Sequence, residues 1–181
     1  RIKYHLQKAY YLATTGRPGP VWLDIPTDIQ SAFVDEKVLE SFSPEEIKIK
    51  YDNDIGEKAA QTVELLKKSK RPIILAGQGI KISKAVGDFL KFVEKYKLPI
   101  LTARNANDIV SSDHSLFIGR PGMFGQRAAN FAVQNSDLLI SIGTRLSLPQ
   151  IGYDSKDFAR NAKKVMVDID KAELEKNTII A

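Results

Sequence analysis

The sequence predicts an α/β fold, a three-layer α/β/α arrangement in which helices cover both faces of a doubly wound parallel sheet. The apolar run at 138–142 has almost no polar alternation and ends abruptly at Gly143. Such a run is typical of a strand that is buried on both faces of a parallel sheet. Short apolar runs also alternate with helical patterns of about 10 to 15 residues, which is typical of βαβ units with right-handed crossovers.

The first segment predicts a helix followed by a strand. Residues 2–15 have helical apolar spacing, and Gly16 is a C-terminal stop signal. A turn rich in glycine and proline then leads into a short predicted strand at 21–25, which Pro26 ends. No earlier strand is present to pair with it. Residues 1–30 are therefore interpreted as the helix-strand tail of a preceding domain.

Residues 31–54 are polar and irregular, which is the composition of a linker. Within them, Ser43 is expected to cap a short turn, because Pro44 suits the first helical position and Glu46 the capping-box position. An extended linker lying across the next domain is the alternative.

Residues 55–181 have a regular pattern and are expected to form one domain. Helices are expected at 55–69, 83–95 and 126–135, and a further helix is expected to begin at 171–176. Strands are expected at 72–76, 99–102, 138–142 and 164–169.

Composition argues against several classes of protein. The chain has no cysteine, and its two histidines, His5 and His114, lie far apart, so neither disulfides nor a zinc site is expected. The net charge is +5, but the lysines are spread along the chain without interleaved aromatic residues, which argues against nucleic-acid binding. No apolar run approaches the roughly 20 residues that span a membrane, and no signal peptide is recognised. A cytoplasmic location is the expectation.

Three weak features fall where predicted strands end. They are Gly77-Gln78-Gly79, Gly143-Thr144-Arg145 and Asp168-Ile169-Asp170. In open α/β sheets the ligand crevice lies outside the carboxyl ends of the strands, so these features line one nucleotide-type pocket if the strands are neighbours. The alternatives are purely structural: glycines that only turn the chain, a solvated Arg145, and an Asp170 that caps the next helix.

A fourth feature is the glycine-rich loop Gly122-Met123-Phe124-Gly125, which precedes the helix at 126–135. Its backbone amides are suited to a phosphate or to the flat face of a cofactor, and an ordinary flexible loop is the alternative. The sequence offers no nucleophile–base pair, paired catalytic carboxylates or metal cluster, so no catalytic residue and no metal ligand is assigned.

Several motifs resemble one enzyme family. The segment G-R-P-G-P-V-W-L-D-I-P at 16–26 resembles the end of the pyrimidine-binding domain of thiamine-diphosphate enzymes of the acetolactate synthase family. The segments at 72–80, 121–145 and 164–176 resemble the central domain of the same family, in the same order. The stretch L-S-L-P-Q-I-G-Y at 146–153 most resembles a subgroup of which some members are associated with surface-polysaccharide biosynthesis genes.

The resemblance implies a sheet of about six strands, of the DHS-like NAD/FAD-binding domain type, that holds FAD or a related adenine nucleotide. The implied cofactor contacts are Gly77, Gln78, Gly79, Thr102, Gly122, Met123, Phe124, Gly143, Thr144, Arg145, Asp168, Ile169 and Asp170. The chain departs from the family pattern in two places: Phe124 stands where His is usual, and residues 146–149 replace F-D-D-R. The second departure removes polar contacts that a flavin would use.

The resemblance also implies that the chemistry lies outside this chain. The catalytic glutamate is expected upstream of Arg1, and the motif that binds the diphosphate and magnesium is expected downstream of Ala181. The parent is expected to be a carboligase or decarboxylase that acts on a 2-oxo acid such as pyruvate, and to be a homodimer or homotetramer whose other two domains are the partners of this chain. The alternatives are a stand-alone dinucleotide (NAD or FAD) binding module and a structural domain with an empty pocket.

Overall fold

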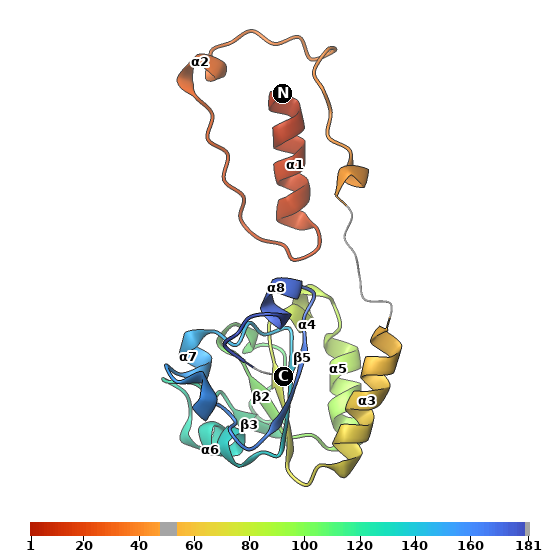
Figure 1. Cartoon of the computed structure of the whole chain (residues 1–181), viewed down its shortest axis with the longest axis vertical. Helices are drawn as coiled ribbons and strands as arrows, with labels where there is room; N and C mark the ends of the chain where they lie inside the picture. The colour runs from red at the N-terminus through yellow and green to blue at the C-terminus, as the bar shows by residue number, and fades with distance from the viewer. Residues whose placement is uncertain (48–53, 180–181) are drawn as a thin grey trace. The chain divides into compact units, whose positions relative to one another are not determined.

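The computed structural model describes residues 1–47 and 54–179 (Figure 1). The chain divides into two compact units, Arg1–Asn53 and Asp54–Ala181. Residues 48–53 of the expected linker lie outside the described part. No helix among the described residues has both the length and the apolar character needed to cross a membrane.

The first unit contains the helices α1 (Ile2–Thr14) and α2 (Thr27–Gln30) and the 3-10 helix η1 (Pro44–Glu46). The predicted capping box is formed: Ser43 Oγ accepts from a backbone amide of η1, and the Glu46 carboxylate accepts from Ser43 N. The Tyr4 hydroxyl donates to Glu46 at 2.7 Å, and this hydrogen bond lowers the pKa of the Glu46 carboxyl.

The strand predicted at 21–25 is wrong, because residues 18–26 form neither helix nor strand. The described part of this unit contains no strand that could pair with it, and a lone strand is not stable. None of residues 1–47 is buried, and the Trp22 side chain is 89% exposed. The described part of this unit therefore has no hydrophobic core of its own.

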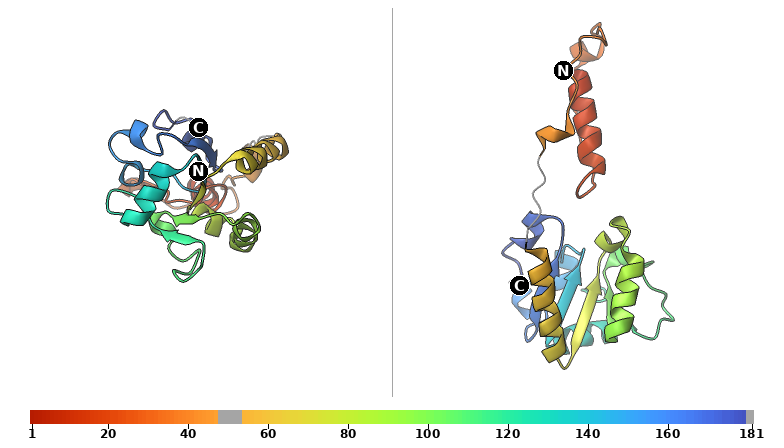
Figure 2. Two further views of the ribbon diagram at one scale, coloured as in Figure 1. Left: turned by 90° about the horizontal axis from the view of Figure 1, so that it is seen from below. Right: turned by 90° about the vertical axis from the view of Figure 1, so that its right-hand side faces the viewer.

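The second unit is a parallel sheet with helices around it (Figure 2). Its strands are β1 (Pro72–Ala76), β2 (Ile100–Thr102), β3 (Phe117–Gly119), β4 (Leu138–Ile142) and β5 (Lys163–Val167). Its helices are α3 (Ile55–Lys68), α4 (Gly79–Ile82), α5 (Val86–Tyr96), α6 (Arg127–Asn135), α7 (Leu148–Ile151) and α8 (Lys171–Leu174). The short 3-10 turns are η2 (Arg104–Ala106) and η3 (Ser155–Asp157).

Alternate side chains of the central strands build two separate cores, which gives the three predicted layers. Ile74 and Ile140 point to one face, where they pack with α3, α4 and α5. Ile73 and Leu139 point to the other face, where they pack with α6 and α7. Because both faces are covered, β1 and β4 are apolar along almost their whole length.

The strand order is β3-β2-β1-β4-β5, with all neighbours parallel. The chain moves outward from β1 to β3 and then returns to place β4 against the other side of β1. The sheet is therefore doubly wound, and its winding reverses between β1 and β4. A ligand crevice is expected at the carboxyl ends of these two strands. The described residues supply five strands, one fewer than the resemblance implies.

The strands and long helices predicted at 72–76, 138–142 and 55–69 agree with the structure to within one residue. The strand β3 was not predicted from the sequence, because it has only three residues, is half exposed and lacks the continuous apolar run of the central strands. The expected helix at 83–95 begins later, because a separate short helix, α4, precedes it.

At the opposite edge of the sheet, where the strands begin, the Asp137 carboxylate connects two segments of the chain by hydrogen bonds. Asp137, just before β4, accepts hydrogen bonds from Ser69 Oγ, from Lys70 N at 2.7 Å and from Arg71 N at 2.9 Å. Partial burial would raise the pKa of Asp137, but these hydrogen bonds outweigh it and lower the pKa to about 2. Asp137 therefore joins the turn between α3 and β1 to the start of β4.

Candidate functional site

The turns that follow β1 and β4 touch each other through their backbones. Gly77 N donates to Ile142 O at 2.8 Å, and Gly79 N donates to Gly143 O at 3.0 Å. A Cβ on Gly77 would lie 2.1 Å from Gly143 O, and Gly143 itself has a φ of +61°. The glycines are therefore needed for close approach and for a left-handed backbone. Since the amides of Gly77 and Gly79 are already used, they are not free to bind a phosphate.

Two buried oxygens at this edge lack a hydrogen-bond partner in the described structure. They are Gln78 Oε1, in the turn after β1, and Thr102 Oγ1, at the last residue of β2. Thr102 is completely buried and pairs in register with Ala76 of β1. Native proteins satisfy most buried polar atoms, so unpaired ones on adjacent strand ends are consistent with a ligand that supplies the missing hydrogen bonds.

Arg145 is held in place by a buried carboxylate. Its Nε lies 2.7 Å from Oε1 of Glu173 on α8, and the other carboxylate oxygen of Glu173 lies 2.9 Å from Lys176 Nζ. Lys176 also donates to the Arg145 carbonyl oxygen. The Arg145 side chain is still 68% exposed, although its Nε is paired with Glu173. Arg145 is therefore an oriented cation rather than a freely moving surface residue.

The Asp168–Asp170 segment forms the turn between β5 and α8. Asp168 Oδ1 accepts from Asp170 N at 3.0 Å, and Asp170 Oδ1 accepts from Ala172 N at 3.0 Å. Asp170 is thus the N-cap of α8, as the structural alternative predicted, and Ile169 is exposed. The second oxygen of Asp168 is not used by this turn, and a carboxylate in this position can accept from ribose hydroxyls.

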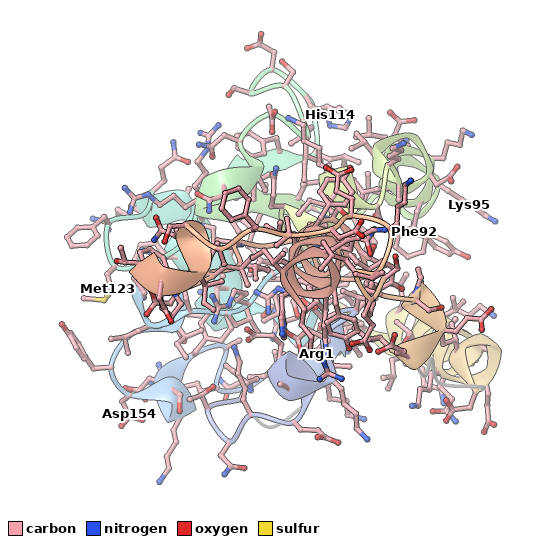
Figure 3. All side chains as sticks on the ribbon, turned by 90° about the horizontal axis from the view of Figure 1, so that it is seen from above. Arg1, Phe92, Lys95, His114, Met123 and Asp154 are labelled. Carbon is pink, nitrogen blue, oxygen red and sulfur yellow. The ribbon has the colours of Figure 1, made fainter. Side chains whose placement is uncertain are left out.

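Hydrogen bonds connect the Gly122–Phe124 loop to α6 and to α7. Asn130 on α6 accepts from Gly122 N at 2.8 Å and donates to Gly122 O at 3.0 Å. Met123 N donates to Pro149 O at 2.8 Å. The Met123 side chain is directed outward (Figure 3), and the Phe124 ring is 92% exposed. The loop therefore presents apolar side chains to whatever lies outside this unit.

Residues 146–149, one of the two places where the chain departs from the pattern that the resemblance implies, have a structural use here. Leu146 is buried in the core beneath α6, with a left-handed φ of +47°. Pro149 stands in the first turn of α7. A shallow hollow of about 360 Å³ lies on the neighbouring outer face of α6, and it is lined by Gly125, Arg127, Asn130, Phe131 and Gln134. This hollow does not include the carboxyl ends of the strands.

The structure thus brings together the ends of β2, β1, β4 and β5, and with them the candidate residues that follow these strands. Within the described ranges no group of His, Asp or Glu is arranged to hold a metal ion. Glu173 and Lys176 were not predicted from the sequence as part of this edge. Glu173 lies three residues after the N-cap Asp170, so its spacing fits a capping box, although its carboxylate instead reaches Arg145.

The fold and the arrangement of this edge define a doubly wound, Rossmann-like α/β domain. Residues 59–181 match the family described as thiamine pyrophosphate enzyme, central domain. Because this match covers more than half of the sequence, the chain belongs to that family.

Relatives extend the similarity into the first unit. The chain is 40% identical over 175 residues to a probable acetolactate synthase large subunit of Methanococcus aeolicus. The aligned region covers 94% of this chain and 29% of that relative. It is 38% identical over 174 residues to the acetolactate synthase large subunit of Lactococcus lactis subsp. lactis, with 93% and 29% covered. It is 36% identical over 171 residues to the acetolactate synthase isozyme 2 large subunit of Escherichia coli K12, with 94% and 30% covered. The chain thus spans about three tenths of the length of these relatives.

Proposed function

We propose that this chain is part of a thiamine-diphosphate-dependent carboligase or decarboxylase, similar to acetolactate synthase, that acts on a 2-oxo acid such as pyruvate. The observation that carries the proposal is the family match over 59–181, together with relatives at 36–40% identity along almost the whole chain. Thiamine diphosphate and magnesium would be bound by other domains of the parent.

Within that parent, residues 55–181 would act as a scaffold that also holds an adenine nucleotide such as FAD. The residues at the carboxyl edge fit such a group in three respects. Gln78 Oε1 and Thr102 Oγ1 are buried and unpaired, Arg145 presents an oriented cation, and Asp168 keeps one carboxylate oxygen outside its own turn. A nucleotide would supply hydroxyl donors for the oxygens and a phosphate for the cation.

The chain's own residues would bind and orient this nucleotide and would not perform chemistry on it. Asp168 would accept hydrogen bonds from the ribose, and Arg145 would neutralise the phosphate charge. Gly143 would act only indirectly, because its close approach is to the backbone of Gly79, which joins the turns after β1 and β4. Phe124 and residues 146–149 would contribute few polar contacts, so the affinity would depend mainly on the ends of β1, β2, β4 and β5.

Residues 1–30 would belong to the preceding pyrimidine-binding domain, with 31–54 as the linker. Support comes from the absence of a buried residue anywhere in 1–47 and from the exposed Trp22. These apolar side chains would be covered by the rest of that domain, and the parent would be a homodimer or homotetramer.

The test is an assay of the longer protein that carries this segment, with pyruvate, thiamine diphosphate and Mg²⁺. We expect pyruvate to be consumed only when thiamine diphosphate is present, and we expect residues 1–181 alone to consume none. If the longer protein binds thiamine diphosphate and consumes neither pyruvate nor other 2-oxo acids, the proposed reaction is wrong.

A further inference from the structure

Glu173 is the only charged side chain that is buried among the residues the structure describes. It is 8% exposed, and it lies near the start of α8, close to the end of β4. Burying a carboxylate is costly unless cations and hydrogen bonds compensate it. The packing of the four-residue helix α8 does not by itself explain why a carboxylate is buried at this position.

Both oxygens of the Glu173 carboxylate are used, each by a different cation. Oε1 receives Arg145 Nε at 2.7 Å, and Oε2 receives Lys176 Nζ at 2.9 Å. Lys176 is mostly buried, whereas Arg145 is mostly exposed. Lys176 also donates to the Arg145 carbonyl oxygen. Arg145 is therefore contacted twice, at its backbone by Lys176 and at its side chain by Glu173.

The contact with Glu173 uses the inner nitrogen of the guanidinium group. A planar guanidinium that is fixed at Nε has its outer amino groups in a defined direction, and these groups bind the two oxygens of a phosphate as a fork. Fixing the side chain in advance also removes the entropy cost of ordering it when a ligand binds. The arrangement is thus suited to a preorganised phosphate contact.

We propose that Glu173 is a positioning residue that aims Arg145 at the phosphate groups of the adenine nucleotide. This inference rests on the proposed nucleotide site. It adds that the site recognises the diphosphate part of the ligand through the Glu173–Arg145 pair, separately from any contacts with adenine and ribose.

The experiment compares ADP and adenosine as ligands of the 181-residue chain, by titration calorimetry. We expect wild type to bind ADP about ten times or more tighter than adenosine, which is the scale of hydrogen bonds to a charged group. Arg145→Gln should remove most of this preference and leave adenosine binding unchanged. Glu173→Gln should do the same, and the double variant should be no worse than Arg145→Gln, because Glu173 acts through Arg145.

The matched control is Glu175→Gln. Glu175 follows α8 directly and pairs with Lys171 at 3.3 Å, but both side chains are largely exposed, so this variant should keep the full ADP preference. If Glu173→Gln does not fold, Glu173→Asp retains the charge and shortens the reach, and it should also reduce the preference for ADP selectively.

Three results would overturn the inference. If the Glu173 variant weakens ADP and adenosine equally, Glu173 only supports α8. If wild type prefers ADP and the Glu173 variant keeps the whole preference, Arg145 needs no positioning, although the nucleotide site stands. If wild type binds neither ligand, the nucleotide site itself is wrong and this inference fails with it.

Discussion

Gly77→Ala is expected to lower the free energy of unfolding of the second unit by about 3 kcal/mol or more. The new methyl group would lie 2.1 Å from the carbonyl oxygen of Gly143 and 2.6 Å from the Cα of Thr144. Both atoms belong to the backbone of the turn after β4, which is itself bonded to β5 through Gly143 N and Val167 O at 2.8 Å. The steric clash can therefore be relieved only if the carboxyl ends of β1 and β4 move apart. Chemical denaturation followed by circular dichroism measures the loss.

Gly87→Ala is the matched control for this substitution. Gly87 lies near the start of α5, and a Cβ there would meet no atom within 4 Å. Alanine in a helix is favoured over glycine by up to about 1 kcal/mol, so this variant should be as stable as wild type or slightly more stable. Equal stability of the two alanine variants would show that the turns after β1 and β4 are not in contact. Tryptophan fluorescence is unsuitable because the single tryptophan, Trp22, lies in the first unit.

Asp137→Asn is expected to destabilise the second unit by about 2 kcal/mol at pH 7, which corresponds to a fall in melting temperature of roughly 4–8 °C. The ionised carboxylate accepts from Ser69 Oγ and from the amides of Lys70 and Arg71. An asparagine offers one acceptor oxygen and turns an NH₂ group toward one or more of these donors. Two of these donors share Oδ1 and Lys70 N uses Oδ2, so Asp137→Asn would lose at least one of the three hydrogen bonds, together with the negative charge that strengthens the others.

The pH dependence of this effect has a definite sign. The folded-state pKa of Asp137 is lowered to about 2, below the ordinary value of 3.8, so its stabilisation is fully present above about pH 4 and is lost as the pH falls toward 2. The difference in stability between wild type and Asp137→Asn should therefore shrink across that interval. Asp113→Asn, at an exposed aspartate, should change stability by less than about 0.5 kcal/mol. A gap between wild type and Asp137→Asn that stays constant from pH 6 to pH 2 would contradict the assignment.

The parts of the fold that sequence patterns predicted best are those buried on both faces. The strands β1 and β4 are continuous apolar runs because a core lies on each side of them. Their burial can therefore be recognised from the unbroken run of apolar residues in the sequence. In contrast, β3 is short and half exposed, so its pairing with β2 decides its conformation more than its composition does. The strand wrongly predicted at 21–25 shows the reverse case, an apolar segment without a partner strand.

The location of the candidate site was predictable because parallel strands end at one edge. The glycines and aspartates that follow the strands mark that edge in the sequence, and the neighbouring positions of β1, β4 and β5 bring them together. The hydrogen bonds within the edge were not predictable. Gly77 and Gly79 use their amides on β4, and Glu173 reaches Arg145 across 28 residues, which no local spacing could indicate.

The most direct test of the account is to titrate the purified chain with FAD and follow both the flavin absorbance and the melting temperature. We predict saturable binding and a rise in melting temperature, which amounts to about 2.7 kcal/mol of added stability at a hundredfold excess over Kd. Thr102→Val, which removes the buried unpaired hydroxyl, should weaken FAD binding without destabilising the fold. Unchanged melting of the wild-type chain with both FAD and ADP would contradict a nucleotide site at the carboxyl edge of the sheet.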